Sequence, residues 1–157
     1  MKHVITALVQ NQPGVLAHIA GMFAARGFNI DSLVVGRTED SELSGMTIVV
    51  IGDDSVLEQV RKQLGKVVSV VKVRDFTEVA AVQRNLLLIR VHAPGDRRPE
   101  VVDLVNLFRG RVADVAKDSL IIEMTGTEDK LEAFTDLVRP YGIRELARTG
   151  VLAMQRG

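Results

Sequence analysis

The stretch VITALVQNQPGVLAHIAGMFAARGFNIDSLVVG, residues 4–36, decides the fold because the spacing of its apolar residues changes twice. Residues 4–9 are a short apolar run rich in β-formers, and the polar turn 10–14 ends it, which predicts a strand followed by a turn. The apolar residues then recur at helical spacing until Gly27, a residue suited to end a helix in the left-handed conformation. From residue 28 to 37 the pattern is again that of a strand. The predicted order is therefore strand, helix, strand.

The following forty residues complete a unit. Residues 46–51 and 67–73 are predicted strands, and between them Asp53 offers an N-cap to an apolar helical stripe that Gly65 ends. Because both strands are apolar on both alternations, we expect dimerisation or domain packing on the sheet face that the helices leave open. The order of this unit is βαββαβ.

The second half of the chain repeats this order. Its predicted strands are 86–91, 111–116, 120–124 and 143–154, and its predicted helices are 99–108 and the segment between Thr127 and Pro140. An α+β fold with two tandem ferredoxin-like βαββαβ units is therefore predicted, with two helices on one face of each antiparallel sheet. We expect a first domain over residues 1–76, a linker over 77–85 and a second domain over 86–157.

Composition excludes several classes of protein. The chain has 157 residues, of which 46% are hydrophobic, enough for packed cores. Its 20 Lys and Arg residues balance 20 Asp and Glu residues, so no global field attracts nucleic acid or anionic lipid. It has no cysteine, hence no disulfide and no thiolate nucleophile, and no stretch approaches the roughly 20 apolar residues of a membrane span. We predict a cytoplasmic protein without membrane association.

Catalytic and metal-binding groups are hard to assemble from this sequence. His3, His18 and His92 stand far apart and lack a short ligand spacing, and no glycine-rich phosphate loop occurs. The acidic cluster Glu39, Asp40 and Glu42 is typical of a solvated loop rather than a cation site. We therefore expect no catalytic residue, no metal site and no cofactor in this chain.

Nucleic-acid binding is a further function to consider, because the RNA-recognition motif has the same order of elements and binds RNA. That use needs aromatic residues on the sheet within a basic surface. Aromatic residues are 4% of this chain, and its one tyrosine, Tyr141, falls in a predicted turn. The basic pair Arg97-Arg98 lies in a predicted loop and is interpreted as solvent-exposed. We expect no nucleic-acid partner.

The turn Asn11–Gly14 is the remaining candidate site. A strand that turns directly into a helix places the N–H groups of Gly14, Val15 and Leu16 at a helix N-terminus, a natural carboxylate site. Asn11 can accept from an ammonium group while its amide donates to a carboxylate. The alternative is that Asn11 only turns the chain and that Pro13 occupies a first helical position. Both interpretations remain open on spacing alone.

Asn29, just before Ile30 at the start of the second predicted strand, has a similar double interpretation. The Asn29 amide either orients a ligand at a strand edge or only shapes the turn into the strand. Spacing does not separate these alternatives.

The sequence resembles a known family, the small subunit of acetolactate (acetohydroxyacid) synthase, over nearly its whole length. The matching stretches are NQPGVLAHIAGMFAARGFNIDSLVVG at 11–36, MTIVVIGDDSVLEQVRKQLGKVVSVVKV at 46–73 and FRGRVADVAKDSLIIEMTGTEDKLEAFTDLVRPYGIRELARTG at 108–150. The segments GFNIDSL, FRGR and ARTG, in this order and spacing, are the specific part of the match. The resemblance implies that the first domain is an ACT domain, a fold widely used as an amino-acid sensor.

The family's members form homodimers through their ACT sheets, with valine or a related amino acid at the interface. This resemblance implies effector-binding positions at Asn11, Gly14, Val15 and Leu16 of one chain and at Asn29 and Ile30 of the other. A hydrophobic pocket separates side chains that differ by one methylene by only about 1 to 3 kcal/mol. The expected effector is therefore valine, leucine or isoleucine, and the sequence does not separate the three.

The resemblance also implies a partner, the large catalytic subunit, which carries thiamine diphosphate, FAD and magnesium. The small subunit raises its activity and makes it sensitive to feedback by branched-chain amino acids. We hypothesise that the exposed hairpin 38–45 contacts this partner, and we assign the second domain to dimer support and large-subunit contact. Two rivals are a free-standing ACT sensor with another partner, against which the match at 108–150 argues, and a small ferredoxin-like enzyme, for which no acid, base or nucleophile grouping is found.

Overall fold

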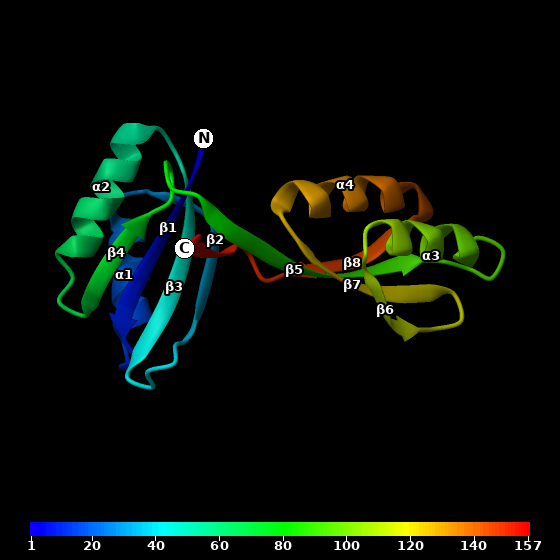
Figure 1. Cartoon of the computed structure of the whole chain (residues 1–157), viewed down its shortest axis with the longest axis horizontal. Coiled ribbons are helices and arrows are strands. Elements are labelled where there is room, and N and C mark those ends of the chain that lie inside the picture. Colours follow the sequence, from blue (N-terminus) through cyan, green and yellow to red (C-terminus); the bar gives the residue numbers. More distant parts are fainter. The chain divides into compact units, whose positions relative to one another are not determined.

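The computed structural model describes residues 1–157, which form two compact units. Residues 1–82 and 151–157 make up the first unit, and residues 83–150 make up the second. Each is an antiparallel sheet that carries two helices, and Figure 1 labels the elements. The predicted α+β class, with two βαββαβ units, is confirmed.

The first unit has the strand order β2-β3-β1-β4. Alternate residues of β1, from Ile5 to Val9, are buried and pack with the apolar stripes of the two helices in one core. The stripe of α1 includes Ile19 and Phe23, and that of α2 includes Val60 and Leu64. The element bounds are β1 Lys2–Gln10, α1 Val15–Ala25, β2 Asn29–Arg37, β3 Leu43–Ile51, α2 Asp54–Gly65 and β4 Val70–Asp75.

The second unit has the corresponding strand order, β6-β7-β5-β8. Its core is centred on Ile89 of β5, Ile122 of β7 and Phe134 of α4, none of which is exposed to solvent. Phe134 packs edge-to-face against Phe108, with ring centroids 5.4 Å apart. The element bounds are β5 Ala81–His92, α3 Arg98–Leu107, β6 Arg111–Val115, β7 Ser119–Gly126, α4 Glu128–Val138, η1 Arg139–Tyr141, β8 Ile143–Arg148 and β9 Leu152–Gln155.

The helix ends follow the predicted chemistry in part. Gly27 adopts the left-handed conformation with φ 65°, and the Asp53 carboxylate caps α2 by accepting from the Val56 N–H at 3.0 Å. Gly65 does not have a positive φ, because α2 ends through Lys66 at φ −85°. Thr127 is the N-cap of α4, as predicted, but its hydroxyl makes no capping hydrogen bond.

Several predicted strands have different bounds in the structure, among them the fourth strand, β5 and the last predicted strand. The fourth strand begins at Val70 rather than 67, because Val67 is buried in a turn and accepts from the Val70 N–H. Strand β5 begins at Ala81 rather than 86. The predicted strand 143–154 is two strands, interrupted where Gly150 takes a φ of 97°.

Residues 151–157 group with the first unit. Val151 is 7% exposed, and the N–H of Arg156 donates to the Ala80 carbonyl at 2.9 Å. Strand β9 accordingly pairs with β5. The division into domains 1–76 and 86–157 with a linker over 77–85 stays a prediction. None of the helices has the length and apolar character needed to cross a membrane.

Candidate functional site

The loop between β1 and α1 is the most open helix start in the first unit. Gly14 is the N-cap of α1, with φ 86° and ψ −10°, and the helix begins at Val15. Pro13 therefore precedes the N-cap, and the alternative that placed it at a first helical position is wrong. The reason is the left-handed conformation of Gly14, which separates Pro13 from the helical backbone path.

Nothing in the chain fills this helix start. No side chain caps α1, and its first turn holds no acidic residue. A Cβ placed on Gly14 would meet no atom within 4 Å. The Val15 N–H reaches the Gln12 carbonyl only at 3.4 Å, a long bond, and Leu16 is 45% exposed. The loop thus presents N–H groups beside an exposed apolar side chain, which suits a carboxylate attached to an apolar group.

Asn11 is held by the hairpin that joins β2 to β3. Its backbone N–H donates to the Glu42 carbonyl at 2.7 Å, and its Nδ2 donates to the Ser41 carbonyl at 3.1 Å. One of the two hydrogens of the Asn11 side-chain amide is therefore bonded to the protein and is not available to a ligand. Sequence spacing gave no signal of this contact, because 30 residues separate its two partners.

The part of the hairpin 38–45 that joins the two strands, residues 38–42, is an exposed turn held by short-range bonds. It is called the hairpin 38–42 below. The Thr38 hydroxyl donates to the carbonyls of Asp40 and Leu43, at 3.0 and 3.1 Å. The Asp40 carboxylate accepts from the Glu42 N–H at 3.0 Å. The acidic residues of this segment thus shape the turn, as a solvated loop requires.

Asn29 and Ile30 lie at the opposite end of the sheet from Asn11. Asn29 and Lys2 both pair with Ile51, whereas Gln10 pairs with Leu43. Nine-residue strands such as β1 span roughly 25 Å, so a single chain does not bring Asn29 near Asn11. Both Asn29 and Asn11 are exposed, and Ile30 is half-buried.

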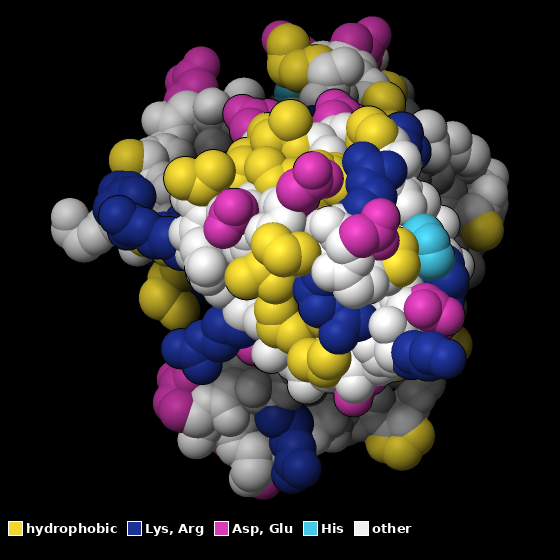
Figure 2. All heavy atoms as spheres, turned by 90° about the vertical axis from the view of Figure 1, so that its right-hand side faces the viewer, with side chains coloured by type: hydrophobic (Ala, Val, Ile, Leu, Met, Phe, Trp, Pro, Cys, Tyr) yellow, Lys and Arg dark blue, Asp and Glu magenta, His cyan; other side chains and the backbone are white.

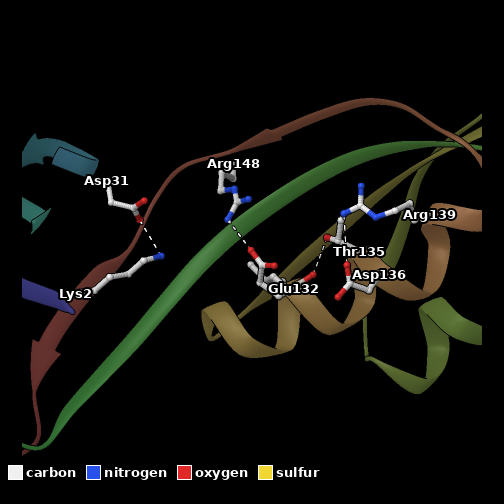
Figure 3. Close-up of polar contacts among 8 residues, drawn as sticks. Lys2, Asp31, Glu132, Thr135, Asp136, Arg139 and Arg148 are labelled. Atoms are coloured by element: carbon white, nitrogen blue, oxygen red, sulfur yellow. Dashed lines mark hydrogen bonds and ion pairs between the residues drawn. The ribbon is translucent and has the colours of Figure 1, made fainter. Parts of the chain in front are cut away.

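The end of β2 that carries Asn29 is irregular. The register of β2 against β3 shifts between Ile30 and Ser32, which is a β-bulge at Asp31. The Asp31 carboxylate pairs with the Lys2 ammonium at 3.3 Å, as Figure 3 shows. In the strand order β2-β3-β1-β4, β2 is an edge strand. Its outer edge has no partner strand within the first unit.

The corresponding loop of the second unit is filled by Arg98. Its Nε donates to the Ala93 carbonyl at 3.2 Å, and its guanidinium also donates to the carbonyls of Ala116 and Lys117. Arg98 is half-buried, so the predicted exposure of both arginines is wrong for this one. The reason is that three carbonyls around the start of α3 require donors. Figure 2 shows that charges of both signs are interspersed on this end of the unit.

The three histidines do not converge. His3 is buried, with ring nitrogens at hydrogen-bond distance from the Gly52 carbonyl and the Thr77 hydroxyl. His92 Nδ1 accepts from the Arg144 guanidinium at 2.6 Å, and His18 is exposed. No group of three or more His, Cys, Asp or Glu side chains is placed to hold a metal ion.

Comparison with known proteins identifies the family. A family model described as "AHAS small subunit-like ACT domain" matches residues 5–72, and one described as "Small subunit of acetolactate synthase" matches residues 84–157. The chain is 61% identical to a probable acetolactate synthase small subunit of Archaeoglobus fulgidus, across 100% of this chain and 98% of that protein. The chain belongs to the acetolactate synthase small-subunit family. The first unit is thus its ACT regulatory domain.

Other members of the acetolactate synthase small-subunit family agree. The small subunit of Aquifex aeolicus is 51% identical over 99% of this chain and 81% of its own length. A crystal structure of the small subunit from Thermotoga maritima matches with a TM-score of 0.90 and 43% identity, over 100% of this chain and 98% of that one. The match of the second unit decides against a free-standing ACT sensor. A small subunit works with a large catalytic subunit in branched-chain amino-acid biosynthesis.

Proposed function

We propose that this small subunit activates the large catalytic subunit and makes it sensitive to feedback inhibition by valine, leucine or isoleucine. The observation that carries the proposal is the unfilled start of α1 at Gly14. Its N–H groups are donors for the effector carboxylate, and the field of the helix N-terminus favours a negative charge there.

The two halves of the effector site are proposed to meet across a homodimer. If the free edge of β2 pairs antiparallel with β2 of a second copy, Asn29 of one chain lies beside the Arg37 end of the other. Arg37 pairs with Ser44, which places it at the end of the sheet where β1 passes into Asn11. This pairing also covers a nine-residue edge strand that would otherwise stay open.

In this arrangement each effector group has a partner. The N–H groups of Gly14 and Val15 hold the carboxylate, and the amides of Asn11 and of Asn29 from the second chain fix the polar head. The branched side chain lies against Leu16 and against Ile30 of the second chain. These apolar surfaces suit valine, leucine or isoleucine, and one methylene changes the binding free energy by about 1 to 3 kcal/mol, too little to exclude any of the three.

Calorimetric titration of the chain with each of the three amino acids tests this site. Gly14→Asp introduces a carboxylate at the helix start and is expected to weaken binding at least tenfold, a loss of about 1.4 kcal/mol or more. Gly14→Asn has the same size without the charge, and asparagine tolerates the left-handed conformation comparatively well. It should retain more affinity than Gly14→Asp. Equal binding by Gly14→Asp and the parent chain contradicts the site.

The hairpin 38–45 is proposed as a contact with the large subunit, and the second domain as support for the dimer and for that contact. The catalytic partner is proposed to carry thiamine diphosphate, FAD and magnesium. Activity of the large subunit should rise when this chain is added and fall again with valine. Shortening the hairpin should remove both effects, whereas effector binding, measured alone, should be weakened but still detectable. Full activation and inhibition by the shortened chain would exclude the hairpin contact.

A further inference from the structure

Asn11 joins the proposed effector loop directly to the hairpin 38–42. The backbone bond from Asn11 N–H to the Glu42 carbonyl, at 2.7 Å, continues the β1–β3 ladder by one step past Gln10. The side-chain bond to the Ser41 carbonyl, at 3.1 Å, is a second link. Between the loop and the hairpin lies a hollow of about 380 Å³, lined in part by Gln12 and Glu42.

The chemistry of the Asn11 amide leaves one atom available. A carbonyl only accepts hydrogen bonds, so the atom that faces Ser41 is Nδ2 and the opposite atom of the amide is Oδ1. No group of the chain donates to Oδ1. An amino-acid ammonium group, which carries only donors, is the complementary partner. Asn11 can therefore hold the hairpin with one atom and an effector with the other.

We propose that Asn11 couples effector occupancy to the order of the hairpin 38–42. This inference rests on the proposed effector site. When the ammonium group binds Oδ1, the amide is fixed in the orientation that also bonds Ser41, and a charged partner on Oδ1 polarises and strengthens the bond from Nδ2. The effector thus stiffens the hairpin without displacing any contact. Because such coupling is reciprocal, an ordered hairpin also raises affinity for the effector.

Hydrogen–deuterium exchange of the full chain, with and without saturating valine, measures the coupling. The informative amides are those of Glu42 and Leu43, which donate to the Asp40 carboxylate and carbonyl. Valine should slow their exchange roughly 2- to 10-fold, the change that strengthening one hydrogen bond allows. In Gly14→Asp, whose effector affinity is expected to be at least tenfold weaker, the valine concentration that just saturates the parent chain should slow their exchange less.

Asn11→Asp separates the two roles of the side chain. Aspartate has the shape of asparagine and keeps an acceptor for the ammonium group, but it has no N–H for Ser41. At saturating valine this variant should bind the effector without protecting the hairpin. Thr38→Val loosens the hairpin from its other end and should weaken valine binding several-fold, whereas Thr127→Val, at a hydroxyl that makes no capping bond, should not.

The outcomes are distinct. Valine binding by the parent chain with unchanged hairpin exchange overturns the coupling and leaves the effector site intact. Hairpin protection retained in Asn11→Asp also overturns it. Absence of binding by valine, leucine and isoleucine overturns both the effector site and the coupling.

Discussion

The two units share one topology but differ at the start of their first helix, which is open in the first unit and occupied by a side chain in the second. In each, a side chain from that region holds the neighbouring β-hairpin: Asn11 holds Ser41, and Arg98 holds Ala116 and Lys117. The arginine is a donor only and is committed to protein carbonyls, whereas the asparagine keeps an unused acceptor. The start of the first helix is therefore closed by a side chain in the second unit and open in the first.

The starts of α1 and α3 also differ in charge. The first turn of α3 holds Glu100, whose carboxylate lies 3.6 Å from the Arg97 guanidinium. A hydrogen bond with Glu100 also raises the pKa of Tyr141, whose ring lies 4.4 Å from the Arg97 guanidinium carbon. The first turn of α1 holds no acidic residue. The second unit thus supplies its own anion, and the first leaves that place for one from outside.

The largest expected effects come from the two cores. Phe23→Ala and Phe134→Ala each remove a buried ring with an edge-to-face neighbour and should cost about 3 to 5 kcal/mol of unfolding free energy. Urea denaturation followed by exchange of amides in each unit measures the loss. We expect Phe23→Ala to destabilise the first unit selectively and Phe134→Ala the second. Equal destabilisation of both units by either variant would show that they unfold as one.

The next largest effect is expected at the starts of α3 and α1. Arg98→Ala leaves three carbonyls without their donor and should cost about 1 to 3 kcal/mol, since hydrogen bonds from charged groups are the stronger class. Asn11→Ala removes one exposed bond and should cost less than about 1 kcal/mol. Thermal denaturation compares the two variants. A larger loss for Asn11→Ala would reverse the comparison.

A smaller effect concerns acid sensitivity at the second helix of each unit. The Ser55 hydroxyl and the Val56 N–H lower the pKa of the Asp53 carboxyl below its ordinary 3.8. Its contribution to stability is therefore present above the ordinary pKa and is lost as the pH falls through the lowered value. The parent chain should lose stability more steeply than Asp53→Asn as the pH falls through 3.8 and on through the lowered pKa. Replacement of Thr127, the neutral N-cap of α4, should not alter this slope.

The smallest effect is expected from the exposed ion pairs of Figure 3. Glu132 and Arg148 lie 3.8 Å apart, with both side chains more than two-fifths exposed. Glu132→Gln should change the unfolding free energy by less than about 1 kcal/mol, and added salt should reduce the difference further. Asp31→Asn, in the first unit, should behave alike. A salt-independent loss above that size would indicate a role beyond the pair.

The fold was predictable because apolar spacing is a local signal. The change from strand to helical period around Gly14, and the left-handed Gly27, were both accessible from neighbouring residues. Contacts over long separations were not: the bond from Asn11 to Ser41 and the burial of Arg98 depend on the pairing of whole strands. The open backbone at Gly14 was predictable as a helix start, but its conformation and lack of a cap required the structure.

The grouping of residues 151–157 with the first unit has a mechanical consequence. Both ends of the chain belong to that unit, and the Arg156 N–H is fastened to the Ala80 carbonyl. Force applied between the termini would act on this hydrogen bond and on the β5–β9 pairing before it acted on residues 83–150. The second unit would be loaded only after the C-terminal segment had detached, so a pulling experiment should record the earliest rupture in the first unit.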